Sequence, residues 1–337
     1  MLKSFPLRGV TPPNAELGSR VSKAVRVVYL GGLGRSGSTL LERLLGELPG
    51  VCPAGEVVHM WQRGVAENER CGCGEAFGAC DFWIKVGKAA FGGWENVSTD
   101  RIIGLRATVD RTRRIPLLAR RSLPARLQAA VTDYTGYYLS VYRAIADVSG
   151  CQTVVDSSKH ASLAFCLARR EEIGLRVIHL VRDSRAVAYS WTTKVARPDG
   201  DTGNYMTTYR PARAAAQWNA QNGALQLLAR RGTEVLRLRY EDFVAAPEQA
   251  VRQAATFAGL DTGDLPLGIL GSDDESPCVL LSKAHTASGN PLRFATGKVP
   301  IRSDDRWRAS MPGAERRTVT ALTLPLLSHY GYIGRAA

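Results

Sequence analysis

The chain has 337 residues, and 44 Lys and Arg against 31 Asp and Glu give a formal net charge of +13. Hydrophobic residues make up 45% and charged residues 22%, which excludes a largely disordered chain, a collagen-like chain and a coiled coil. The positive charge favours an anionic ligand, an acidic surface or nucleic acid, without choosing among them. No stretch reaches the ~18 apolar residues of a membrane span, and the first twenty residues lack the apolar centre of a signal peptide. We therefore expect no membrane span and a cytoplasmic location.

The first part of the chain predicts a strand, a glycine-rich loop and a helix, in that order. Residues 1–22 form a polar, proline-containing arm. Residues 25–30, VRVVYL, are a β-branched run typical of a buried strand. The loop GGLGRSGST follows, and leucines then recur at helical spacing until Pro49-Gly50 ends the helix.

The same unit recurs along the chain. Three further strands are predicted, each followed by polar residues: 153–155 before Asp156-Ser157-Ser158-Lys159, 176–181 before Arg182-Asp183, and 234–238 before Arg239-Tyr240. Strands that alternate with helices indicate an α/β fold, with a P-loop-like parallel sheet flanked by helices. The polar residues after each strand should collect along one edge of this sheet, where ligands bind in open α/β sheets.

The region between the first and second units is predicted to be a helical insertion over the active site. It spans residues 71–150 and includes a basic segment and a helix with four tyrosines between 134 and 142. We expect these tyrosines to pack in the core. The insertion is not expected to fold separately, so residues 23–334 form a single domain.

The glycine-rich loop has the spacing of a phosphate-binding loop. Gly32-x4-Gly37-x-Thr39 matches a P-loop except that Ser38 stands where the nucleoside-triphosphate motif has Lys. A strand-to-helix loop of small residues offers free N–H groups and the positive end of a helix to an anion. Arg35 adds a bidentate donor for a phosphate oxygen. The missing Lys argues against ATP or GTP, whose β- and γ-phosphates it normally reaches.

The sequence of this loop resembles that of a known enzyme family. Gly34-Arg35-Ser36-Gly37-Ser38-Thr39-Leu40 resembles the 5′-phosphosulfate loop of sulfotransferases that use 3′-phosphoadenosine 5′-phosphosulfate (PAPS). It is most similar to the tyrosylprotein and related bacterial sulfotransferases. The resemblance implies a P-loop-like fold, PAPS as co-substrate, and binding of the donor by residues 35–40.

A second family motif is an Arg followed eight residues later by a Ser. Arg182 and Ser190 match it, and the resemblance implies that they bind the 3′-phosphate. Tyr240 matches the tyrosine of the family that contacts the nucleotide. A C-terminal loop should close over the donor; Lys298 is the expected phosphate contact, with Arg293 and Arg302 left open.

The resemblance also implies the catalytic residues. Glu56 lies twenty-one residues after Arg35, where tyrosylprotein-type enzymes carry their base. A Glu after a buried strand can have a raised pKa, as a base requires, although a helix N-terminal acid is the alternative. Lys159 resembles the lysine that supports the departing bridging oxygen, and Arg35 is expected to assist it. His59, near Glu56, is the second candidate for the base.

Five of the seven cysteines are scattered along the chain, and only Cys71 and Cys73 lie close together, with Cys80 following them. Cys71, Cys73 and Cys80 are too few ligands for a zinc site unless Cys52 or a His joins them. We expect a loop tied by a local contact, or unpaired thiols, and no metal.

The sequence therefore predicts a PAPS-dependent sulfotransferase. The acceptor is a hydroxyl or amine on a small molecule, carbohydrate, lipid or peptide, which the sequence does not identify. The alternatives are a P-loop-like kinase or other nucleotide-binding protein, and a basic nucleic-acid-binding module. The second would show aromatics interleaved with basic residues on one surface; no such segment dominates, so no nucleic acid is expected. The oligomeric state is not predicted.

Overall fold

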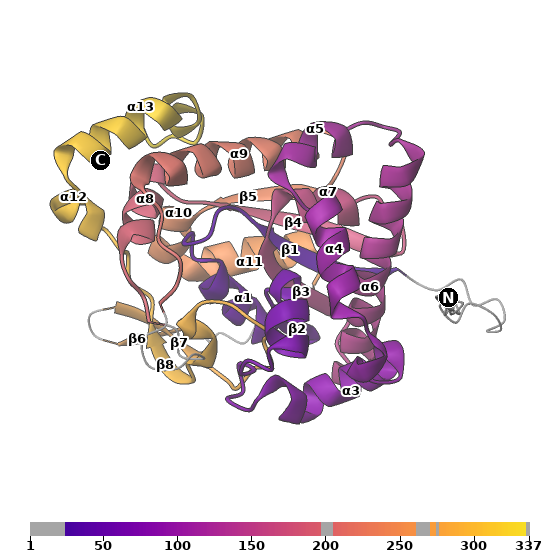
Figure 1. Ribbon diagram of the computed structural model, residues 1–337. Helices are drawn as coiled ribbons and strands as arrows, with labels where there is room; N and C mark the ends of the chain where they lie inside the picture. Colours follow the sequence, from indigo (N-terminus) through magenta and orange to yellow (C-terminus); the bar gives the residue numbers. More distant parts are fainter. Residues whose placement is uncertain (1–23, 197–204, 261–269, 274–275, 335–337) are drawn as a thin grey trace.

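The core of the molecule is a sheet of five parallel strands in the order β2-β3-β1-β4-β5 (Figure 1). This computed structural model describes residues 24–196, 205–260, 270–273 and 276–334, so the predicted arm 1–22 lies outside the described residues. The strands are β1 (Val25–Gly31), β2 (Val51–Gly55), β3 (Thr153–Lys159), β4 (Ile173–Val181) and β5 (Val235–Arg239). The α/β prediction is confirmed.

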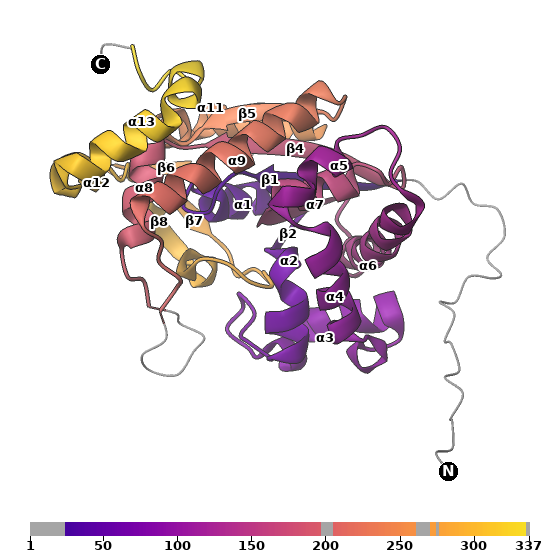
Figure 2. The same cartoon turned by 45° about the horizontal axis from the view of Figure 1, so that its top comes forward.

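Helices cover both faces of the sheet, as the alternation of side chains along β1 requires. Val28 and Leu30 pack on one face, and Val27 and Tyr29 on the other. The first face carries α1 (Ser38–Gly46), α10 (Tyr240–Ala245) and α11 (Pro247–Ala258). The second carries α6 (Ala125–Ser149), α7 (Ala161–Leu167) and α9 (Pro211–Arg230), and α9 crosses in front of the sheet in Figure 2.

The region 71–150 is helical, as predicted. It holds η2 (Phe77–Ala79), α3 (Asp81–Phe91), η3 (Trp94–Asn96), α4 (Thr99–Val109), η4 (Thr112–Arg114), α5 (Ile115–Leu118) and α6, and it follows α2 (Val57–His59) and the π-helical turn η1 (Met60–Ala66). Tyr134, Tyr138 and Tyr142 on α6 are completely buried, so their predicted core position is confirmed. They share one apolar cluster with Tyr29 of the sheet, and we infer from this common core a single domain.

The C-terminal part adds a second, smaller sheet that the sequence did not predict. Its antiparallel strands are β6 (Leu270–Asp273), β7 (Ser276–Leu281) and β8 (Gly297–Pro300), and η6 (Pro291–Phe294) lies between β7 and β8. Helices α8 (Ser184–Thr192), α12 (Arg306–Ser310) and α13 (Gly313–His329) complete the fold. Within the described ranges, no helix is both long and apolar enough to cross a membrane.

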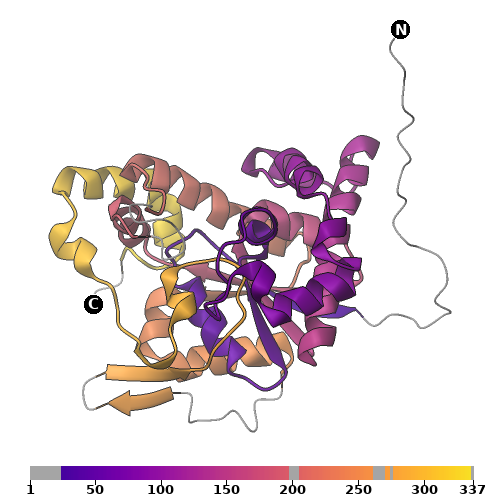
Figure 3. The ribbon, with the colours of Figure 1, turned by 60° about the horizontal axis from the view of Figure 1, so that its bottom comes forward.

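Residues 282–290, here named the strap, connect the small sheet back to the edge of the large one. Figure 3 shows this orange segment running from the antiparallel strands toward the purple N-terminal third. The Ala287 N–H donates to the Ala54 carbonyl at 2.9 Å, and the Glu56 N–H donates to the Ser288 carbonyl at 3.2 Å. The strap therefore holds the end of β2 from outside the parallel sheet.

Candidate active site

The loop between β1 and α1 has an unusual backbone. Arg35 and Gly37 both have positive φ, 75° and 86°, and a Cβ on Gly37 would lie 2.6 Å from the Tyr240 ring. Gly37 is therefore required both by its conformation and by close packing. A non-glycine residue at positive φ, such as Arg35, is the kind of strained position that clusters at functional sites.

The Arg35 side chain carries donors that the protein itself does not satisfy. Its Nε and Nη2 atoms are buried and have no hydrogen-bond partner among the residues that the structure describes, while the guanidinium lies 5.3 Å from the centre of the Trp191 ring. Burial lowers the pKa of Arg35, and Glu56 partly offsets this. Because unsatisfied buried donors are costly, this arrangement suits a bound anion.

The N-terminus of α1 offers further donors beside Arg35. Its N-cap, Gly37, has no side chain to cap the first turn, and the free N–H groups and helix dipole favour an anion. Ser38, Thr39 and Leu40 line a cleft of about 1040 Å³. Ser36 instead donates to the Leu33 carbonyl at 2.7 Å, so its hydroxyl shapes the loop.

Lys159 and Glu56 meet across the ends of β3 and β2. Lys159 Nζ lies 2.5 Å from Glu56 Oε1 and 2.9 Å from the Ser157 carbonyl. Burial alone would raise the pKa of Glu56, but the Lys159 ammonium outweighs it and lowers that pKa to about 2. The expectation of a raised pKa is therefore wrong, because nothing in the local sequence indicates that these two side chains pair directly.

A buried acid on α1 joins the two strand ends. Glu42 accepts hydrogen bonds from the Gly55 N–H at 2.5 Å and from Ser157 Oγ at 2.7 Å. Burial raises its pKa to about 7. Sequence analysis missed this residue, although an acid within the leucine-rich run LLERLLG was a signal that could have found it. Glu42 positions the residues that precede Glu56 and flank Lys159.

Asp156 fixes the same strand end from the opposite face. It accepts hydrogen bonds from Tyr142 Oη at 2.5 Å and from the Ser158 N–H at 2.8 Å. Ser158 Oγ in turn accepts from the Val58 N–H at 2.9 Å. Each residue of the segment 156–159 therefore has a defined contact, which fixes the position of Lys159.

Two histidines lie beside the ion pair. His59 Nε2 is 3.5 Å from Glu56 Oε2, and burial lowers the pKa of His59 well below its usual value despite that carboxylate. This burial favours the neutral imidazole form of His59. His160 Nδ1 lies 2.9 Å from Asp110 Oδ2, and both histidines line the cleft.

Arg182 links three separate segments at the other end of the cleft. Its Nη1 donates to the Arg35 carbonyl at 2.9 Å, and its Nη2 donates to the Asp304 carbonyl at 2.8 Å. Its guanidinium lies 4.4 Å from the centre of the Tyr240 ring. Ser190 on α8 lines the same cleft, so the residues of both sequence motifs come together.

The C-terminal cations differ in their position. Arg302 and Arg306 line the cleft, whereas Lys298 lies exposed on β8 outside the described lining. Arg293 is buried and donates to the Thr286 carbonyl at 3.1 Å. Of the three candidates from the sequence, Arg302 is therefore the one at the cleft.

The cleft wall is strongly cationic. Among the described residues that line it, Glu56 is the one acid. The cations are Arg35, Arg63, Lys159, Arg182, Arg213, Arg302 and Arg306. This excess favours an anionic ligand. Thr112 is the contribution of the region 71–150 to the wall.

The solved structures that resemble this chain include sulfotransferases. A sulfotransferase domain of an olefin synthase from Synechococcus PCC 7002 is 20% identical, with 93% of this chain and 98% of that one covered and a TM-score of 0.49. A sulfotransferase domain from the curacin biosynthetic pathway is 18% identical, with 90% and 98% covered and a TM-score of 0.45. Sulfotransferase STF1 of Mycobacterium tuberculosis H37Rv is 14% identical, with 72% and 70% covered and a TM-score of 0.41.

None of the curated proteins compared is a match. The family model described as the sulfotransferase family matches residues 174–264. This segment contains Arg182, Ser190 and Tyr240, three of the residues that meet at the cleft. Over this segment the chain is similar to the sulfotransferase family.

Proposed function

We propose that this enzyme transfers a sulfuryl group from PAPS to a hydroxyl or amine of an acceptor. With a hydroxyl acceptor, the products are a sulfate ester and 3′-phosphoadenosine 5′-phosphate. The observation that carries the proposal is the pair of buried, unsatisfied donors on Arg35 at the uncapped N-terminus of α1. An anion of the donor's 5′-phosphosulfate type supplies the acceptor oxygens that these donors lack.

The two ends of the cleft suit the two anionic ends of the donor. Residues 35–40 bind the 5′-phosphosulfate, and Arg182 with Ser190 binds the 3′-phosphate. Tyr240 contacts Gly37 and Arg182, and thus lies where a nucleotide passes between these ends. Arg302 and Arg306, which line the cleft, supply cations on the C-terminal side.

The reaction moves one proton and one electron pair. The acceptor oxygen forms a bond to sulfur as the bond from sulfur to the bridging oxygen breaks. Glu56 takes the proton of the acceptor hydroxyl, and the electron pair of the broken bond stays on the 5′-phosphate of the nucleotide. Lys159 and Arg35 stabilise the charge that develops there.

The ion pair couples donor binding to the strength of the base. Lys159 is shared between Glu56 and the anionic donor, and a shift of its ammonium toward the donor weakens its contact with Glu56. Burial of Glu56, which raises its pKa, is then offset less. The carboxylate becomes a stronger base when the donor is present.

Nucleotide binding tests the donor assignment. We expect 3′-phosphoadenosine 5′-phosphate to bind more tightly than adenosine 5′-phosphate, measured by isothermal titration calorimetry. Arg182→Ala should weaken the first nucleotide by roughly 10–100-fold, since a charge-assisted contact is worth about 1.5–3 kcal/mol, and affect the second far less. Equal losses for both nucleotides would contradict the assignment.

Transfer itself is tested with a panel of acceptors. The protein is incubated with PAPS and with phenols, sugars, hydroxylated lipids or tyrosine peptides, and products are analysed by mass spectrometry for the added sulfate. We expect a gain on at least one acceptor that is absent with Arg35→Ala. If PAPS neither binds nor is consumed with any class, the proposal fails.

A further inference from the structure

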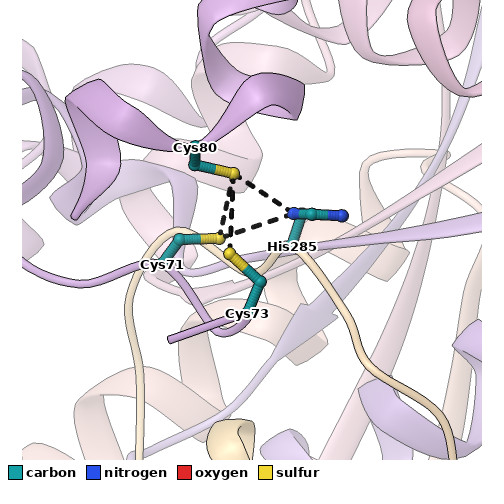
Figure 4. Close-up of side chains that lie close together, drawn as sticks. All are labelled: Cys71, Cys73, Cys80 and His285. Atoms are coloured by element: carbon teal, nitrogen blue, oxygen red, sulfur yellow. Dashed lines mark hydrogen bonds between the residues drawn. The ribbon is translucent and has the colours of Figure 1, made fainter. Parts of the chain in front are cut away.

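Four potential metal ligands from distant parts of the chain meet outside the cleft. Figure 4 shows Cys71, Cys73, Cys80 and His285 pointing toward one another, and their ligand atoms all lie within 4.8 Å of each other. Cys80 Sγ is 3.7 Å from both Cys71 Sγ and Cys73 Sγ. His285 Nδ1 lies 3.2 Å from Cys80 Sγ and 3.9 Å from Cys71 Sγ.

These separations are those of ligands around a single zinc ion. Zn–S bonds of ~2.3 Å and Zn–N bonds of ~2.0 Å in tetrahedral geometry place two sulfurs about 3.8 Å apart, and a sulfur and a nitrogen about 3.6 Å apart. A disulfide would require a distance of about 2.05 Å between two sulfurs. The three thiols are therefore unpaired, at distances that suit a shared ion.

The backbone around the cluster is tightly constrained. The Gly72 N–H donates to the Thr286 carbonyl at 2.9 Å, and a Cβ on Gly72 would lie 2.3 Å from Thr286 Oγ1. The His285 ring stacks on Phe82, with ring centroids 5.1 Å apart. The loop that carries the cysteines and the residue next to the histidine are thus held together independently of the four side chains.

We propose that Cys71, Cys73, Cys80 and His285 bind one structural Zn²⁺ ion. Three soft thiolates and one imidazole are a donor set that selects zinc, and four protein ligands leave no open position for a substrate. The fourth ligand lies 205 residues after Cys80, so sequence spacing did not reveal it. The expectation that the chain needs no metal is revised by this proposal.

The ion would join the region 71–80 to the strap. His285 lies three residues before Ser288, whose carbonyl accepts from the Glu56 N–H. Ser288 Oγ also accepts from Arg63 Nη1 at 3.1 Å. Zinc bound at His285 therefore stabilises the strap that holds the backbone of Glu56. This site does not depend on the identity of the donor or acceptor.

Metal analysis of the full-length protein tests the proposal directly. The wild type, Cys80→Ser, His285→Ala and the control Cys151→Ser are purified under reducing conditions, and metal content is measured by inductively coupled plasma mass spectrometry. Cys151 is a partly buried thiol outside the cluster. We expect one zinc per chain in the wild type and the control, and almost none in the two variants. Loss of a ligand should weaken zinc binding by more than ~100-fold, which exceeds the effect of outer-shell changes.

Two further measurements keep the test independent of folding. Co²⁺ added to the wild type after chelation of its metal should give the visible absorption bands of a tetrahedral ion and the charge-transfer band of thiolate ligands. Cys73→Ser, at a partly exposed position, should weaken the charge-transfer band while the circular dichroism spectrum stays unchanged. Added zinc should raise the Tm of the chelated wild type and of Cys151→Ser alike. If the chelated wild type binds zinc no better than Cys80→Ser, or if peptide mapping finds a disulfide among the three cysteines, the proposal is overturned.

Discussion

Glu56 and Lys159 form an ion pair of 2.5 Å inside the cleft, which gives each of them two tasks. Glu56 neutralises the lysine before the donor binds, and we propose that it accepts the proton of the acceptor afterwards. The pKa of Glu56, about 2, keeps it ionised throughout the neutral range. It is therefore in the protonation state that a general base requires.

Glu56→Gln keeps the shape of the side chain and removes the base. Turnover should fall by ~10²–10⁴, the usual contribution of a positioned base, while the affinity for 3′-phosphoadenosine 5′-phosphate stays nearly unchanged. Steady-state kinetics and calorimetry on the same preparation measure both quantities. Full turnover in Glu56→Gln would assign the base elsewhere, and His59→Gln would be the next variant to test.

Lys159→Ala should change the pH dependence of the reaction. Burial raises the pKa of Glu56, and Lys159 is its main opposing influence, so the variant should lose activity at a higher pH on the acid side. We expect the acid limb of kcat/KM to shift upward by about 1–3 pH units, whatever the absolute rate. Lys159→Arg, which keeps the charge, should not show this shift; identical profiles for Lys159→Ala and wild type would contradict the coupling.

Helix α1 supplies the N-terminus that we propose binds the phosphosulfate, and it also holds the ends of β2 and β3 through Glu42. The pKa of this buried carboxyl rises from 4.5 to about 7 on folding. The folded state therefore holds more protons than the unfolded state between these values. By linkage, stability falls as pH rises through this window.

Glu42→Gln should remove this pH dependence. The shift corresponds to about 3 kcal/mol, so the free energy of unfolding of the variant relative to wild type should rise by about that amount between pH 4.5 and pH 7.5. Urea unfolding at both pH values measures it. The exposed Glu171→Gln is the control for the lost charge, and an equal difference at both pH values would refute the argument.

The sequence predicted the elements with strong local patterns and missed those defined by distant contacts. The β-branched runs of β1, β3, β4 and β5 were found. Strand β2 lacks such a run and contains Pro53, which is tolerated because this strand lies at the edge of the sheet. The loop motifs led to Arg35 and Arg182. Glu42 and His285 were missed because their contacts depend on residues far away in the sequence.

Over the whole molecule, the net charge of +13 is concentrated in part around the cleft, where seven cations face one acid among the described lining residues. We expect long-range attraction of anionic nucleotides that salt weakens. The Kd of 3′-phosphoadenosine 5′-phosphate should rise by roughly tenfold between 0.05 M and 0.5 M NaCl. Arg213→Gln should flatten this dependence and the exposed Arg126→Gln should not; a Kd independent of salt would argue against steering.

The way the strap and η6 join the start of the chain has a consequence for biosynthesis. Arg43 on α1 donates to the carbonyl of Arg293, 250 residues later, and the Glu56 N–H donates to the Ser288 carbonyl. During translation, the loop between β1 and α1 emerges from the ribosome early, but the contacts that fix Glu56 form only when most of the chain has been made. Contacts of such sequence separation form slowly, so a nascent chain that ends after β5 has the loop for an anion but lacks the strap that positions Glu56.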